Sequence, residues 1–149
     1  MTYIFPARFS PKINNELPAD NGFEYVVLAL WDSPKKDGIP QLAFIHDTRQ
    51  RPSSWSKQQI AEQYIVGLKK IALSWKDARV SDSKKISTSA IEMWRFDYWH
   101  SPDAGPAYNA AVVIPLKDRS VLAIQLNASS QNALDDEVDS LRQLKFDPR

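Results

Sequence analysis

The sequence predicts an α+β fold in which a mostly antiparallel sheet of about five to six strands is covered by two main helices, at 56–75 and 130–145. Apolar, β-branched runs separated by short turn segments indicate hairpins, and hairpins join antiparallel strands. Two longer segments instead place apolar residues at helical spacing. With 149 residues, 43% of them hydrophobic, the chain is long enough to bury one core without a covalent staple.

The first part of the chain predicts an arm followed by a hairpin. Residues 1–22 contain three prolines and little periodicity, which indicates an irregular N-terminal arm with one short strand near 3–5. The run at 23–33 is rich in β-branched and aromatic residues and predicts a strand. A turn with an Asp-Gly pair occupies 34–40, so 41–48 is expected to be the second arm of the hairpin.

The first helix has the clearest pattern in the chain. Ser56 and Gln59 have the spacing of a capping box, which predicts that the helix begins there. Gly67 lies inside the pattern and weakens the helix by about 1 kcal/mol relative to alanine. The stripe of apolar residues that outweighs this cost is Ile60, Tyr64, Leu68, Ile71 and Trp75.

The middle and end of the chain predict further strands and the second helix. The polar stretch 76–88 has room for a short strand at 78–81, and 88–100 predicts a long strand. Residues 108–116 and 120–128 form a second hairpin. Ser130 is the expected N-cap of the second helix, whose first turns are acidic. Its apolar stripe is Leu134, Val138, Leu141 and Leu144.

The stretch "MWRFDYWHS" (93–101) has four aromatic rings, and strand alternation separates them. Trp94, Phe96 and Tyr98 share one face, which we predict to be core. Arg95 and Asp97 share the other face and can pair there. A stacking platform for nucleic acid would need basic residues beside the rings, and Arg95 is the only cation within the strand.

The rings that remain for function are at the end of this strand. Trp99, His100 and Tyr108 are therefore predicted to form one partly exposed binding patch, since Trp and Tyr dominate interface hot spots. The alternative is that Trp99 packs beneath the second helix. No catalytic, cofactor-binding or metal-binding residue is assigned.

Several kinds of chemistry lack the residues they need. The chain has no cysteine, and its four glycines are too scattered for a phosphate-binding loop. His46 and His100 have no metal-ligand spacing, and the acidic run 135–139 fits a solvated helix face better than a calcium loop. "RQR" (49–51) could contact a phosphate, but in a nearly neutral chain it does not outweigh a plain surface loop.

Charge and hydropathy bear on partners and location. A formal net charge of +1 argues against a dedicated nucleic-acid binder. The apolar run 25–31 is too short to span a membrane, which needs about 20 such residues. The first ten residues lack the pattern of a signal peptide, although a mature exported domain preceded by an added Met1 would look the same. The oligomeric state is left open.

The order of elements, with the stretches "YIVGLKKI", "ISTSAIEMWRFDY", "AAVVIPLKDRSVLAIQLNASS" and "LDDEVDSLRQLKF", resembles the PsbP-like family. That family includes the extrinsic P protein of photosystem II, a Ran-binding nuclear-import factor and DcrB-like bacterial proteins. The resemblance covers roughly residues 23–147. It implies an α/β/α sandwich, with 1–22 as an arm and 23–149 as a single domain. No functional residue of the family transfers to this chain.

Three functions follow as expectations. The first is a non-enzymatic binding or accessory module that docks on another protein, needs no cofactor, and belongs to an exported or periplasmic bacterial protein. The second is a cytoplasmic adaptor or effector-chaperone, which would need an exposed apolar groove. The third is a small hydrolase that uses His100 with Asp97 or Asp103.

Overall fold

The computed structural model describes residues 3–4, 10–14, 27–31, 42–88, 91–101, 103, 107–141 and 145–146. Two helices are present in this part of the chain, α1 (Lys57–Ala72) and α2 (Gln131–Ser140). The strands are β1 (Tyr3–Ile4), β2 (Ser10–Asn14), β3 (Val27–Trp31), β4 (Leu42–Asp47), β5 (Arg79–Val80), β6 (Lys84–Lys85), β7 (Trp94–Trp99), β8 (Tyr108–Pro115), β9 (Val121–Ala128) and β10 (Lys145–Phe146).

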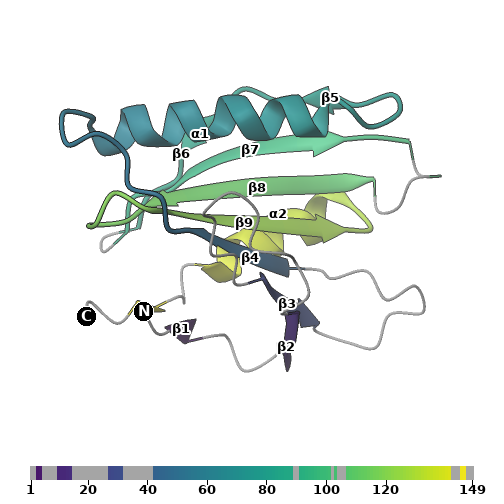
Figure 1. The fold of residues 1–149 in the computed structure, drawn as a ribbon. Helices are drawn as coiled ribbons and strands as arrows, with labels where there is room; N and C mark the ends of the chain where they lie inside the picture. The colour runs from purple at the N-terminus through teal and green to yellow at the C-terminus, as the bar shows by residue number, and fades with distance from the viewer. Residues whose placement is uncertain are drawn as a thin grey trace.

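One antiparallel sheet organises the molecule (Figure 1). Its strand order is β2-β3-β4-β9-β8-β7-β5, and β6 also pairs with β7. Six of these strands have five or more residues, whereas β5 and β6 have two each. The expected α+β fold with an antiparallel sheet is therefore confirmed, and the two short strands are additions at one edge. β1 and β10 pair as a separate two-stranded sheet.

Strand β2 lies within residues 1–22, where the sequence indicates an irregular arm with one short strand near 3–5. It pairs with β3 over its full length and forms the outer edge of the sheet. An edge strand tolerates Pro11 because only one side of it has to supply hydrogen bonds to a neighbour. The short strand near 3–5 is present as β1.

Helix α1 covers one face of the sheet. Its buried residues Ile60, Ala61 and Ile65 pack on side chains of β7, β8 and β9. Trp94 and Phe96, which are 6% and 1% exposed, belong to this cluster, and Tyr98 packs against it partly buried. The predicted inward face of "WRFDYW" is confirmed by the burial of Trp94 and Phe96, whereas Tyr98 is only partly buried.

Helix α2 covers the opposite face. Leu134, Val138 and Leu141 pack on a second cluster that contains Met93 and the alternate residues of β8 and β9. Strands β8 and β9 are thus buried on both faces, which explains their nearly continuous apolar sequences. In Figure 1, α1 and α2 lie on either side of β7, β8 and β9. No helix in the described part of the chain is long and apolar enough to cross a membrane.

The helices and one strand are shorter than predicted. Helix α1 ends at Ala72, and Trp75 lies in the following turn, where Ser74 Oγ donates to the Ile71 carbonyl. Helix α2 ends at Ser140, and residue 145 begins β10 instead of closing the helix. Strand β7 begins only at Trp94, although the pattern predicts a strand from residue 88. The spacing of apolar residues extends beyond the residues that make regular backbone hydrogen bonds. An element predicted from that spacing is therefore longer than the element in the structure.

Candidate functional site

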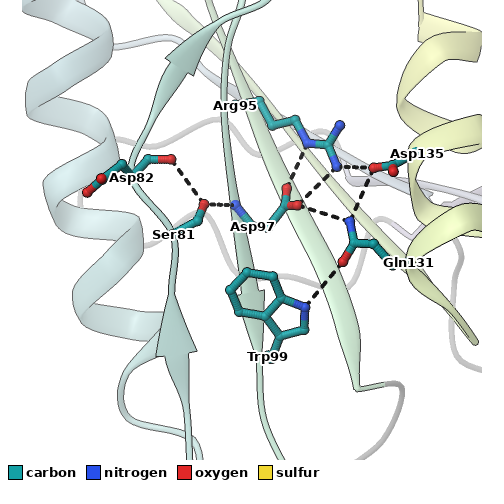
Figure 2. A network of polar contacts seen from close by, with 7 residues as sticks. All are labelled: Ser81, Asp82, Arg95, Asp97, Trp99, Gln131 and Asp135. Carbon is teal, nitrogen blue, oxygen red and sulfur yellow. Dashed lines mark hydrogen bonds and ion pairs between the residues drawn. The ribbon is translucent and has the colours of Figure 1, made fainter.

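A polar network lies between β7 and α2, on the face of the sheet that α2 covers (Figure 2). At its centre is Arg95, which is only 8% exposed. Its Nε donates to Asp97 Oδ1 at 2.7 Å, and its Nη2 donates to Asp135 Oδ1 at 2.7 Å. Gln131 Nε2 donates to both aspartates. The predicted pair of Arg95 and Asp97 is present, and Asp135 extends it to α2.

The hydrogen bonds of this network shift the pKa values of Arg95 and Asp135. Burial alone would lower the pKa of Arg95, but the hydrogen bonds to Asp97 and Asp135 outweigh burial and raise it. The bond from Arg95 lowers the pKa of Asp135. On the other face of β7, burial raises the pKa of Tyr98 to about 12. The ion pairs of Arg95 therefore join β7 to α2.

Two residues of the predicted patch lie side by side. Trp99 and Tyr108 are direct partners across β7 and β8, and both are partly exposed. The indole Nε1 of Trp99 donates to Gln131 Oε1 at 3.4 Å, and the Arg79 guanidinium lies 5.8 Å from a Trp99 ring centroid. Tyr108 packs against the core cluster under α2. Trp99 therefore lies beside the first turn of α2 without being fully covered by it.

His100, the third residue of the predicted patch, points elsewhere. Its ring stacks on Trp75 with centroids 5.0 Å apart and planes 17° apart, and its Nδ1 is 2.9 Å from the Ser101 carbonyl. His100 is 9% exposed. The hydrolase alternative pairs it with Asp97 or Asp103, but no hydrogen bond within the described residues joins His100 to either one. Asp97 instead belongs to the network on the other face.

The other histidine joins two segments that are distant in sequence. His46 Nε2 lies 3.0 Å from Ser120 Oγ, and Ser120 donates through its backbone N and its hydroxyl to Asp118 Oδ1. In a catalytic triad the serine hydroxyl faces the imidazole and the carboxylate orients the histidine. Here the hydroxyl proton goes to the carboxylate, and Ser120 has no exposed surface. The contact holds the β8–β9 turn against β4.

No candidate metal-binding site is found in the described part of the chain. There, no three histidine or acidic side chains are grouped so that they could hold an ion. The acidic run 135–139 lies within α2, where Glu137 is buried and Asp136 and Asp139 are exposed. Its carboxylates therefore point to different sides of a helix.

A pocket of about 380 Å³, open to solvent, lies between α1 and the end of β4. We call it the arginine pocket. Asp47, Arg49 and Arg51 line it on the strand side, and Arg51 also places its guanidinium 5.3 Å from the Tyr64 ring centroid. Its volume is within the usual range of about 300–1,000 Å³ for ligand sites. The helix side is lined by Ile60, Gln63, Tyr64, Gly67, Leu68 and Ile71.

Asp47 fixes the two arginines of this pocket. It has no exposed surface, and it accepts from Arg49 Nη2 at 2.8 Å and from Arg51 Nη2 at 2.9 Å. Burial alone would raise the pKa of Asp47, but these hydrogen bonds outweigh it and hold the pKa below its ordinary value. Arg51 is also tied to the β8–β9 turn, because its backbone N and O bond to Arg119. The guanidinium groups are therefore held in place before any ligand arrives.

Exposed apolar side chains follow one another along the end of α1 and the turn after it. The large hydrophobic residues that are exposed in the described part of the chain are Val66, Ile71, Leu73 and Trp75, at 45–60% exposure. All lie in the second half of α1 or in the turn after it. Ile71 also lines the arginine pocket. We call these four residues the α1 surface.

Sequence reasoning located only part of these features. For "RQR" (49–51) the sequence favours a plain loop, because Asp47 and the helix cannot be placed beside it without the fold. The alternating Asp-x-Arg-x-Arg at 47–51 is the signal that could have marked it. In the sequence, Gly67 indicates only a cost to the helix, and its place in the wall of the pocket depends on the fold.

A scan against protein-family models and a search of curated proteins found no match for the chain. The function must therefore be argued from the geometry.

Proposed function

We propose that the chain is a non-enzymatic binding module that docks another protein through the α1 surface. The observation that carries this proposal is the gathering of exposed Val66, Ile71, Leu73 and Trp75 in one short segment. Scattered single apolar residues are normal on a protein surface, whereas a local concentration marks an interaction site. Trp75 is anchored by its stack on His100, so a partner would meet a ring that is already ordered.

Charge favours a partner with an acidic surface. Helix α1 carries Lys57, Lys69 and Lys70 against a single acidic residue, Glu62. Helix α2, on the opposite face of the sheet, carries four acidic residues and no basic one. The two helices, on opposite faces of the sheet, thus differ in the sign of their net charge. This difference would orient a docking protein more than it would tighten the complex.

The predicted patch fits this proposal in part. His100 supports the α1 surface through Trp75, whereas Trp99 and Tyr108 lie on the α2 side and are candidates for a second contact. The PsbP-like resemblance points the same way, since members of that family dock on different partners, but it stays a prediction. An exported bacterial protein and a cytoplasmic adaptor or effector-chaperone both stay open as predictions.

Site-specific crosslinking tests the proposal. Benzoylphenylalanine replaces Ile71 in the full chain, and cells of the source organism are irradiated. We expect one discrete adduct, whose partner is identified and purified. Wild-type chain should then bind that partner at least about tenfold more tightly than Ile71→Ser, as for a hot-spot residue.

The control places the crosslinker at Lys84, an exposed residue of β6 at the β7 edge of the sheet. No adduct is expected there. Ile71→Ser should leave thermal stability nearly unchanged, because the side chain is exposed. Equal labelling from both positions, or a partner that binds Ile71→Ser as well as wild type, would refute docking through the α1 surface. An adduct with twice the mass of the chain would replace the proposed partner by a second copy.

A further inference from the structure

We infer that the arginine pocket receives a carboxylate side chain of the docking partner, whose neighbouring apolar residue rests on Ile71. This inference rests on the proposed function and adds a defined subsite with its own ligand chemistry. The ligand class is an acidic residue beside an apolar one in a peptide segment.

The charge of the pocket lining selects an anion. Two guanidinium groups and one carboxylate line it, so the lining carries one net positive charge. Arg51 is held nearly buried, with its side chain 13% exposed, while the Arg49 side chain at the rim is 50% exposed. Arg49 Nε and Nη2 already bond to the two oxygens of Asp47, so the attraction of a ligand carboxylate rests on the positive charge of the fixed guanidinium and not on a second matched pair of donors. Asp47 acts as a positioning residue, since it fixes both arginines from beneath.

Gly67 is an independent indication that this wall is kept open. A glycine inside a helix costs about 1 kcal/mol relative to alanine. Nothing lies within 4 Å of a Cβ built at Gly67, so packing in the fold does not require the missing side chain. The position lines the arginine pocket, between Gln63 and Ile71 along the same side of α1. A side chain there would narrow the space that a ligand enters.

The apolar part of the ligand has a defined place. Leu68 and Ile71 line the pocket on the helix side, and Ile71 belongs to both the pocket and the α1 surface. A peptide that lies along α1 can therefore bury an aliphatic side chain on Ile71 while its acidic neighbour reaches Arg49. Of the alternatives, a free phosphate would use only the arginines and would gain nothing from the apolar wall.

The test is a titration of the full-length chain, labelled with nitrogen-15 and followed by NMR. The probe is a short synthetic peptide that alternates glutamate and leucine, and its counterpart replaces each glutamate with glutamine. We expect the amide signals of Gln63 and Gly67 to move saturably with the glutamate peptide. The glutamine peptide, and inorganic phosphate in a third titration, should bind at least about tenfold more weakly, because each lacks one part of the recognition.

Two variants and a control complete the test. Arg49→Gln should weaken the glutamate peptide about tenfold or more, whereas Lys84→Gln removes the same charge from an exposed site at the β7 edge and should not. Gly67→Ala keeps every charge and should raise the melting temperature while weakening the peptide. If Arg49→Gln fails to fold, Gly67→Ala still decides.

The outcomes separate this inference from the proposed function. Equal binding of both peptides, or full binding by Arg49→Gln and Gly67→Ala, would overturn the carboxylate subsite and leave the α1 surface untouched. Amide signals that move at Leu73 but not at Gly67 would also overturn the carboxylate subsite and leave the α1 surface untouched. A saturable response at Gly67 without any crosslinked partner at Ile71 would instead uphold the subsite's preference for carboxylates and refute the docking function.

Discussion

Arg95 shows how a buried cation is accommodated in this fold. Its guanidinium bonds to Asp97 on the same strand and to Asp135 on α2, so one side chain joins two elements. The two partners differ in exposure, because the Asp97 side chain is 15% exposed and that of Asp135 is 50%. Removing the arginine would leave the Asp97 carboxylate without its cation in a poorly solvated place. Removing the charge of Asp135 would leave Arg95 still paired with Asp97.

Arg95→Ala is therefore expected to lower the free energy of unfolding by about 3–5 kcal/mol, as when one partner of a buried pair is lost. Asp135→Asn, the matched control on the exposed side, should cost about 0–1 kcal/mol. Urea denaturation at pH 7 measures both. Similar losses for the two variants would mean that Arg95 is not the centre of the network.

The ionisation of Asp47 makes the free energy of unfolding depend on pH. Its folded pKa lies below the unfolded value, so the folded state prefers the charged form. The stabilisation is complete above the unfolded pKa of about 3.9 and is lost as pH falls through the folded pKa. Asp47→Asn should be less stable at pH 7 and lose less stability between pH 5 and pH 2. Denaturation across this range decides, with exposed Asp136→Asn as the control. Parallel acid limbs for wild type and Asp47→Asn would contradict the assignment.

At the scale of elements, local signals fix where helices begin. Ser56 accepts from the Gln59 backbone N–H, and the Gln59 side chain accepts from the Ser56 N–H, which completes the predicted capping box. Ser130 likewise accepts from the Ala133 N–H at the start of α2. Each cap lies within three residues of its partner, so sequence alone can specify it.

Ser56→Ala should destabilise the protein by about 1 kcal/mol, because the first turn of α1 loses its side-chain acceptor. Ser53→Ala, in the exposed loop just before the helix, should change stability by less than about 0.5 kcal/mol. Thermal denaturation compares the two. Equal effects would show that the cap contributes nothing beyond a surface serine.

Alternate side chains of β7 point to the same face of the sheet, and those of Trp94 and Phe96 point toward α1. Phe96 is 1% exposed under α1, so Phe96→Ala should cost about 3–5 kcal/mol. The exposed Lys117, in the turn between β8 and β9, should accept alanine with almost no change. Chemical denaturation of the two variants provides the measurement. A silent Phe96→Ala would mean that this face of β7 is not core.

At the scale of the whole molecule, β8 and β9 form the centre. Both are paired on two sides and covered by a helix on each face. Amide protons there should exchange only through global opening, whereas those of β5 and β6 should exchange through local fraying. Hydrogen exchange followed by NMR should rank β8 and β9 slowest among the described strands. Protection of β6 equal to that of β9 would contradict this order.

The sequence by itself determined the α+β class, the two helices, their caps and the inward face of β7. These features depend on contacts within a few residues, or on a period of two or 3.6 that is visible in one segment. Helix and strand ends were less well predicted, because apolar spacing continues at Trp75 beyond the last helical hydrogen bond.

Only the tertiary structure decided the candidate site. It brought Arg51 over Tyr64, set His46 against Ser120 across 74 positions of sequence, and turned His100 away from Trp99 and Tyr108. These contacts depend on which strands pair and on where α1 crosses the sheet. No local period encodes that choice, because it is made by the burial of two apolar faces against a shared sheet. The arginine pocket forms where Arg49 and Arg51, just after β4, face the side of α1 that carries Gly67.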